Sequence, residues 1–518
     1  MVRLSNPRLV FGLVVALYLL AFPYHPRMRS PNELCRLWQT RALVDHHALS
    51  INQTIDELGM VGDLSVVNGV YYPSKAPLLS FAAVPIYAVL KLFGPVSEVV
   101  QVYFSRLFLT VLPTLWVLIF IRRFLRSYLS PLLTDSLVAT YALGTMAFNY
   151  SQMFLSHQLT AVLLFIAFYA AWRTLGGQWK KWGWWVCGAF SGAVVATEYT
   201  GALGVVCLAI YAAYAVLTTP DRTRKENGIE LAKVGARVLL GAAPFLLGLM
   251  AYHQAAFGHP LVSGYKFLND PGYQGWHVGG FLGIRFPDPS AFVQSFFSPL
   301  RGLFTLSPFL LLAFGGLRKL WAEHRPLFVL TAALLVGNAY FTSSFAYDSW
   351  GWAVGPRHLT PLLPFLLLPA GLALQRLLEA KSFDGKLGLG LAIGLCVSSV
   401  LIDGALAFVN YVPESTSTSL FGLAVPLFRA GYLPPTVLIF LGIANPVSGL
   451  IALVVLGAAA AVIGLRLGAG QGRAVGVTAA VIIAVHFGLL AGLTRHHDAD
   501  LGNVAFLKQV WIAPPSTP

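Results

Sequence analysis

A small group of charged side chains follows directly after the first apolar segment of this chain. Glu33 and Arg36 lie in the stretch Ser30-Pro-Asn-Glu-Leu-Cys-Arg36, and Lys75 lies in Tyr71-Tyr-Pro-Ser-Lys-Ala-Pro77. A carboxylate can take a proton from a hydroxyl group, and lysine and arginine can bind a phosphate. The residue types and their spacing therefore predict a general base, Glu33, beside an anion site formed by Arg36 and Lys75.

Glu33 has a second interpretation. Ser30, Pro31 and Glu33 match a capping box, in which serine begins a helix, proline takes its first position and the glutamate turns back to cap it. The pattern predicts a short amphipathic helix over residues 31–47, with Arg36 about one turn after Glu33. Glu33 is then either a helix cap only or the catalytic base.

Lys75 also has two interpretations. It could reach lipid headgroups from the start of an interfacial helix, as long basic side chains often do. Alternatively it binds a substrate phosphate, because it lies in a stiff segment between Pro73 and Pro77. The preceding Tyr71 and Tyr72 are predicted to contact the substrate.

Two arginines lie at the start of later apolar segments. Arg301 follows Ser298-Pro-Leu, and Arg357 follows Gly355-Pro. Each could anchor its helix at the headgroups or bind a phosphate through its planar guanidinium group. Arg357 is the stronger phosphate candidate because Gly355 and Pro356 bend the backbone before it.

Other polar residues could line the same site. We expect His157 and His358 to contact the substrate, although a lone histidine at a helix end often only packs. Asp348 is a reserve candidate for the base, and Glu198 lies at a similar helix end. Asp403 falls inside an apolar segment, where a charge is costly and usually functional, unless it pairs with a neighbouring helix.

Two further segments give weaker signals. The loop after residue 257 carries tyrosines, a tryptophan and a histidine, which suit either sugar binding or a membrane-interface belt. The stretch His496-His-Asp-Ala-Asp500 could ligate a metal, but it lies outside any predicted pocket, so the sequence favours a solvated tail. No cofactor is predicted, and a dependence on a divalent metal is left open.

The elements that position these residues are apolar helices. Of the 518 residues, 57% are hydrophobic and 11% are charged, against roughly a quarter charged in soluble domains. About thirteen apolar runs are long enough to span a membrane. The sequence therefore predicts an all-α polytopic membrane protein, a single transmembrane domain over residues 1–518.

Basic residues predict the topology. Clusters of lysine and arginine fall on one side of the membrane if the N-terminus is cytoplasmic and the segment 76–93 lies at the interface. The net charge of +14 then reflects topology, and no nucleic-acid partner is expected. The same topology places outside the loops 24–99, 255–299, 342–357 and 411–435, together with the short tail 494–518 and the C-terminus.

In their order, these elements resemble the membrane-embedded GT-C glycosyltransferases, in particular bacterial relatives of protein O-mannosyltransferases and lipid A aminoarabinose transferases. The similarity covers the first two hundred residues best: an acidic residue in the first outer loop, a Tyr-x-x-Lys-x-Pro element, and the Arg122-Arg123 exit of the next span. The later segments Phe297-Ser-Pro-Leu-Arg-Gly302 and Gly355-Pro-Arg-His-Leu359 are similar to those of bacterial members.

The resemblance implies a polyprenyl-phosphate-linked sugar donor and transfer to a lipid, glycan or protein acceptor outside the cytoplasm. Glu33 would match the catalytic acidic residue of the family's first loop, and Lys75 the lysine near the carrier phosphate. Two positions depart from the family pattern. Asn32 stands where members often carry aspartate, and Ser74 where they often carry an acidic residue.

We therefore expect an inverting glycosyltransferase of the cell envelope, in the inner membrane. Glu33 would take the acceptor proton, and Lys75, Arg36, Arg357 and Arg301 would stabilise the leaving phosphate. A transporter or flippase of a lipid-linked anion is the main alternative, although the inverted repeats typical of that class are not evident. A polymerase or ligase that uses a lipid-linked glycan is the second.

Overall fold

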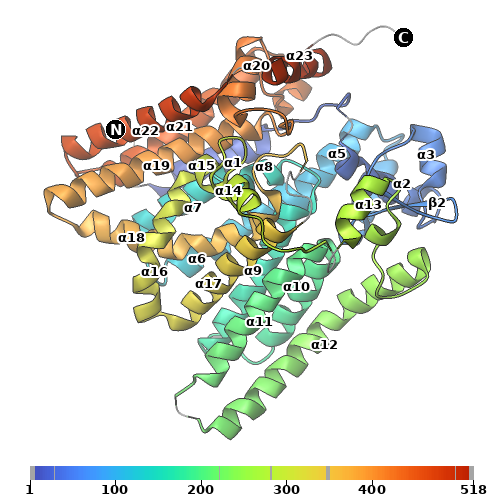
Figure 1. The fold of residues 1–518 in the computed structure, drawn as a ribbon, viewed down its shortest axis with the longest axis horizontal. Helices are drawn as coiled ribbons and strands as arrows, with labels where there is room; N and C mark the ends of the chain where they lie inside the picture. Colours follow the sequence, from blue (N-terminus) through green and yellow to red (C-terminus); the bar gives the residue numbers. More distant parts are fainter. Residues whose placement is uncertain are drawn as a thin grey trace.

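The computed structural model describes residues 6–28, 30–220, 222–279, 283–345, 351–495 and 498–512. These residues form α-helices for the most part, with a single two-stranded hairpin among them (Figure 1). Within the same residues, nine helical segments are long and apolar enough to cross a membrane. The prediction of a helical, multi-pass membrane protein is confirmed.

The long segments follow the predicted apolar runs closely. Several combine adjoining elements, such as α5 (Glu98–Arg106), η1 (Leu107–Val111) and α6 (Leu112–Leu125). The nine are Glu98–Leu125, Ser156–Leu175 (α9), Tyr199–Leu217 (η2 and α11), Arg224–Phe257 (α12), Arg325–Ser344 (α17), Arg357–Glu379 (η5 and α18), Phe383–Ala407 (α19), Val447–Gly468 (α21) and Arg473–Leu493 (α22).

The remaining predicted spans are shorter or interrupted helices. They are α1 (Pro7–Leu20), α7 (Pro131–Leu143), α10 (Gly183–Thr197) and the run α15 (Leu303–Leu306), η4 (Pro308–Leu311) and α16 (Leu312–Glu323). Pro308 has no N–H to donate within a helix, which explains the break in the last of these. The number of spans, about thirteen, and the orientation of the termini stay predictions.

Glycines let the central helices approach closely. A Cβ on Gly188 of α10 would lie 2.1 Å from the carbonyl oxygen of Val238 in α12, and one on Gly192 would lie 2.7 Å from that of Ala242. Small residues at helix contacts are typical of membrane bundles. On the other side of the molecule, α19 packs against α21 and α22, and the three helices lie side by side in Figure 1.

The described part of the segment 24–99, which is predicted to face outward and is named the first outer loop, folds into a small subdomain at one end of the bundle. It contains α2 (Pro31–Asp45), α3 (Asn52–Leu58), strands β1 (Leu64–Val67) and β2 (Val70–Pro73), and α4 (Leu78–Lys91). In Figure 1 these elements gather beside α13 (Pro271–Val278) from the second outer loop. α4 is apolar and short, but its placement at the membrane interface stays a prediction.

The start of α2 differs from the predicted capping box. Pro31 takes the first helical position as predicted, but the Ser30 side chain makes no capping hydrogen bond. Glu33 does not turn back to the helix start, because its carboxylate faces a guanidinium group on α5. The helix itself is confirmed, ending at Asp45, two residues before the predicted end.

The C-terminal segment is not the solvated tail that the sequence indicated. Residues Asp498–Trp511 form helix α23, and the Asp500 carboxylate is buried, where it accepts a hydrogen bond of 2.7 Å from the Ser417 amide. Trp511 stacks on His25 at 4.2 Å between ring centroids. His496 and His497 lie outside the described residues.

Candidate active site

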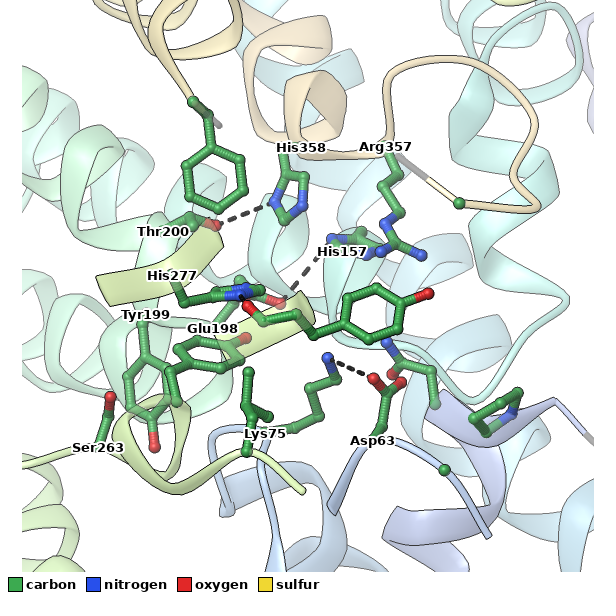
Figure 2. Close-up of a pocket in the computed structure, with 18 of the residues that line it drawn as sticks. Asp63, Lys75, His157, Glu198, Tyr199, Thr200, Ser263, His277, Arg357 and His358 are labelled. Atoms are coloured by element: carbon green, nitrogen blue, oxygen red, sulfur yellow. Dashed lines mark hydrogen bonds and ion pairs between the residues drawn. The ribbon is translucent and has the colours of Figure 1, made fainter. Parts of the chain in front are cut away.

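A large cavity lies where the two outer loops meet the ends of the long helices. Its volume is about 1660 Å³. Its walls come from parts of the chain that are far apart in sequence, represented by Asn32, Lys75, His157, Glu198, Tyr265, Arg357, Tyr411 and Phe506 of α23. Figure 2 shows the charged and aromatic side chains that point into it. Segments far apart in sequence therefore share one large, partly polar space.

The floor of the cavity carries an ion pair built by the hairpin. Asn68 and Gly69 have φ values of 51° and 81°, the left-handed conformation that favours Asn-Gly in tight hairpin turns. The register pairs Leu64 with Pro73, and the Ser74 amide donates to the Asp63 carbonyl at 3.0 Å. This places Asp63 beside Lys75, whose Nζ lies 3.2 Å from the Asp63 carboxylate.

Both members of this pair are charged at neutral pH. Burial alone would raise the pKa of Asp63, but the neighbouring cations Lys75 and Arg357 hold that pKa below its ordinary value. Burial acts to lower the pKa of Lys75, and the Asp63 carboxylate more than offsets it, so that pKa is raised. The floor is thus a fixed carboxylate and a fixed ammonium group.

Arg357 approaches the pair from the opposite wall. It begins η5 (Arg357–Leu366), and in Figure 2 its guanidinium group points down toward Lys75 and Asp63. The Arg357 Nε is buried with no hydrogen-bond partner among the described residues. A buried donor of this kind is costly to leave unpaired, which makes it a ready ligand for an anion in the cavity.

Two histidines and a carboxylate form the rest of this wall. His157 Nδ1 lies 3.9 Å from Glu198 Oε2, and the rings of His157 and His358 are 4.9 Å apart. The hydroxyl group of Thr200 lies 3.2 Å from His358 Nδ1. His157, Arg357 and His358 were all predicted for the site, and all three line the cavity.

Aromatic residues of the second outer loop cover the cavity floor. The Lys75 Nζ lies 5.5 Å from the centre of the Tyr265 ring, and His277 stacks on the same ring at 4.4 Å. Burial lowers the pKa of His277, so this ring is neutral at pH 7. Tyr265, Tyr273 and His277 line the cavity, whereas Trp276 is not among its lining residues.

Glu33 lies outside the cavity. Its carboxylate accepts hydrogen bonds of 2.6 to 3.0 Å from the Arg106 guanidinium group, 2.6 Å from the Phe154 amide and 2.6 Å from the Tyr411 hydroxyl group. The side chain is 2% exposed. This geometry makes Glu33 a structural clamp between α2, α5 and two loops, and it does not support the prediction that Glu33 is the base.

Arg36 contacts a lining residue of the cavity, Glu198, through Ser156. The Arg36 side chain is buried and is not among the lining residues, so its predicted role in binding the donor phosphate stays a prediction. Arg36 Nη2 donates to Ser156 Oγ at 3.1 Å, and Ser156 Oγ donates to Glu198 Oε2 at 2.5 Å. Arg36 therefore fixes the orientation of Glu198 through one serine.

The other predicted residues lie elsewhere. Arg301 is buried and is not among the lining residues. Tyr71 and Tyr72 pack into apolar clusters instead of lining the cavity, the latter at 5.7 Å from the Phe257 ring. Asp348 lies outside the described residues. Asp403 is buried in α19, where it accepts a hydrogen bond of 2.6 Å from the Ser307 hydroxyl group.

Sequence reasoning missed Asp63, although a signal was available. Two short β-prone runs, Leu64-Ser-Val-Val67 and Val70-Tyr-Tyr-Pro73, flank Asn68-Gly69, which is a strong hairpin pattern. Reading that hairpin would have brought Asp63 next to Lys75. Within the described residues, no group of three or more His, Cys, Asp or Glu side chains is arranged to hold a metal ion.

Comparisons with known proteins give likenesses of structure alone. No family model matches the chain, and no curated protein matches it. An oligosaccharyltransferase of Archaeoglobus fulgidus, solved with Zn and sulfate, superposes with a TM-score of 0.50 at 12% identity, over 83% of this chain and 56% of the other. The chain thus spans just over half the length of that protein.

ArnT from Cupriavidus metallidurans, bound to undecaprenyl phosphate, superposes with a TM-score of 0.48 at 14% identity, over 93% of this chain and 76% of the other. The likeness to the oligosaccharyltransferase, together with the arrangement of the helices, supports the resemblance predicted from the sequence. The chain has the GT-C type of membrane glycosyltransferase fold.

Proposed function

We propose that this protein is a membrane glycosyltransferase that takes a sugar from a polyprenyl-phosphate carrier and transfers it to a hydroxyl group of a lipid, glycan or protein acceptor. The observation that carries the proposal is the grouping of Asp63, Lys75 and Arg357 in one cavity of about 1660 Å³ at the ends of the long apolar helices. Transfer takes place on the outer face of the cell membrane, and the N-terminus is cytoplasmic.

Lys75 and Arg357 bind the carrier phosphate. They approach the same space from opposite walls, as Figure 2 shows. Together with Asp63 they carry one net positive charge, which matches the single negative charge of a phosphodiester. Both stabilise the leaving group as negative charge develops on the phosphate oxygen. The prenyl chain lies along the apolar surface of the helices.

Asp63 replaces Glu33 as the proposed base. It takes the proton of the acceptor hydroxyl group while that oxygen forms a bond to the anomeric carbon and the bond from this carbon to the phosphate oxygen breaks. The electron pair of the broken bond stays on the phosphate. When the donor phosphate engages Lys75, the Asp63 carboxylate loses part of its stabilising charge, which raises its pKa and makes it a better proton acceptor.

Glu198, with His157 and the aromatic wall, orients the sugar or the acceptor. Its carboxylate is held by Ser156, and that serine is held by Arg36. Carboxylates fixed in this way suit hydrogen bonds from hydroxyl groups, and Tyr265 offers a ring face to a sugar. These roles require no bound cofactor.

Carrier binding tests the phosphate site. Undecaprenyl phosphate is titrated into the purified full-length protein in detergent, and the dissociation constant is compared between variants. Lys75→Met and Arg357→Met should each weaken binding about tenfold or more, because each removes a charge-assisted contact. Lys319→Met is the matched control, since Lys319 does not line the cavity and its Nζ lies 3.9 Å from the Glu323 carboxylate on α16. Wild-type affinity in both test variants would overturn the assignment.

Transfer is tested separately with labelled polyprenyl-phosphate monosaccharides and a membrane lipid extract. The expected products are a labelled lipid or glycan and free polyprenyl phosphate in equal amounts. Carrier binding without any released polyprenyl phosphate, over a panel of sugars, would instead favour a transporter of lipid-linked anions.

A further inference from the structure

A second, smaller cavity lies far from the active site, between α1 and α6. Its volume is about 420 Å³, within the range of small-molecule sites. Its lining is apolar except at one end: Phe11, Val14 and Val15 of α1 face Leu115, Trp116, Leu118 and Ile119 of α6, and Arg122 completes it. We call it the α1–α6 groove.

The groove is open toward the bilayer side of the helices. Its base is formed by Val14, which is fully buried, and Leu118, which is 4% exposed. Its rims remain exposed, with Val15 at 40%, Trp116 at 48% and Ile119 at 47%. An apolar slot of this kind on a spanning helix is shaped for a hydrocarbon chain.

Positive charge gathers at the closed end of the groove. Arg122 lines it and lies 5.5 Å from the Phe11 ring. Arg122 and Arg126 donate to Asp135 at 2.7 and 3.2 Å, and Arg466 lies 3.8 Å from the same carboxylate. Three guanidinium groups thus share a single carboxylate, which leaves an excess of positive charge.

A fourth cation lies close to this end. Arg8 is exposed and precedes Phe11 by three residues on α1, so the two side chains lie on the same face of the helix. The arginines Arg8 and Arg122 therefore flank the position that the headgroup of a lipid in the groove would occupy.

The α1–α6 groove and the proposed donor site lie toward opposite ends of the segment Glu98–Leu125. The segment Glu98–Leu125 begins next to the first outer loop, where the Tyr24 hydroxyl group contacts Glu98. Arg122 follows 24 residues later, roughly 36 Å along a helix. Such a length spans the hydrocarbon core, so the headgroup end of the groove belongs to the opposite leaflet.

From this combination of shape and charge, we propose that the α1–α6 groove binds a phospholipid with an anionic headgroup, from the leaflet on the N-terminal side. One acyl chain lies against Val14 and Leu118, and the phosphate of the headgroup, with no cationic group to neutralise it, contacts Arg122 and Arg8. A zwitterionic headgroup offers no net charge to this cluster and binds less tightly.

The test uses the full-length protein in detergent, with lipid binding followed by native mass spectrometry and by the thermal unfolding midpoint. Phosphatidylglycerol should bind wild-type protein about tenfold more tightly than phosphatidylcholine with the same acyl chains. Arg122→Gln should abolish this preference. Arg123→Gln is the matched control and should keep it, because the Arg123 guanidinium group lies over Phe120 outside the groove.

A second variant tests the groove without changing its charge. Val15→Trp fills the slot from its exposed rim and should lower the affinity for both lipids, while the arginine cluster with Asp135 stays intact. Glycerol phosphate, which lacks acyl chains, should not bind. Equal affinity of wild-type protein for the two lipids, or a wild-type response of both Arg122→Gln and Val15→Trp, would overturn the proposal, as would binding of glycerol phosphate alone.

Discussion

Two carboxylate–cation pairs lie on either side of Tyr411, and they differ in what surrounds them. The buried pair, Glu33 and Arg106, is closed off by the Phe154 amide and the Tyr411 hydroxyl group. The cavity pair, Asp63 and Lys75, retains side-chain exposures of 28% and 12% and faces a large open volume. The Glu33 carboxylate is enclosed by protein donors and acts as a structural clamp, whereas the partly exposed Asp63 carboxylate keeps capacity for a substrate.

The sharpest way to break this comparison is to neutralise Asp63. Asp63→Asn should reduce turnover by about 100- to 10,000-fold, the usual contribution of a general base. The measurement is release of polyprenyl phosphate from a labelled donor. Asp270→Asn makes the same chemical change in the same cavity and should keep turnover, because asparagine can replace aspartate as the cap of α13. Equal turnover in wild type and Asp63→Asn would exclude Asp63 as the base.

Removing the buried carboxylate should act on stability instead. Glu33→Ala leaves the Arg106 charge buried without its partner, which should lower the free energy of unfolding by roughly 3–5 kcal/mol. Thermal unfolding in detergent measures the loss. The double variant Glu33→Leu/Arg106→Leu should recover part of it, since no unpaired charge remains. A stable Glu33→Ala protein without turnover would restore Glu33 as the base.

The pH dependence of turnover should show the effect of Lys75 on the pKa of Asp63. Because Lys75 and Arg357 hold the pKa of Asp63 below its ordinary value, the free enzyme keeps this base ionised down to low pH. The stabilising contribution of the ionised carboxylate is present above the pKa that Asp63 has in the unfolded chain and is lost as pH falls through its folded pKa. In Lys75→Met the acidic limb of kcat/KM should move to higher pH. An unmoved limb would mean that another group controls it.

A smaller effect is expected from the residues behind Glu198. Arg36→Lys and Ser156→Ala each disturb one hydrogen bond of the chain that orients this carboxylate, which should lower kcat/KM for the acceptor roughly five- to tenfold. The loss should appear as a higher KM for the acceptor, with the affinity for undecaprenyl phosphate unchanged. Weaker carrier binding in Arg36→Lys would instead support the role in phosphate binding predicted from the sequence.

The smallest effect is expected at Tyr71. Its ring packs in the apolar cluster of the first outer loop, so Tyr71→Phe should change the free energy of unfolding by less than about 0.5 kcal/mol and leave turnover unaltered. A clear loss of turnover would show that the tyrosine contacts the substrate, as the sequence suggested.

The apolar helices could be predicted well from the sequence because hydrophobic length is a local property. That Lys75, Arg357, His157 and His358 lie near one another could be anticipated for a related reason: each is a polar residue at the end of an apolar run, and all four line the cavity. The surroundings of Glu33 could not be predicted because its partners Arg106, Phe154 and Tyr411 are distant in sequence, and nothing local reveals that they close around it. Asp63 was missed because its role depends on the register of the hairpin.

Two hydrogen bonds between that hairpin and the loop after α12 limit when the site can form during synthesis. The Asn269 amide donates to the Leu64 carbonyl at 2.9 Å, and the Ser65 hydroxyl group donates to the Gly264 carbonyl at 2.7 Å. These bonds join residues separated by about two hundred positions and by several membrane-inserted helices. During synthesis the ion pair at the floor can assemble early, but its aromatic cover arrives only after α12 has been inserted. A nascent chain that ends before the loop after α12 would leave the Asp63–Lys75 pair exposed to water. A working site therefore requires that both loops reach the same side of the membrane.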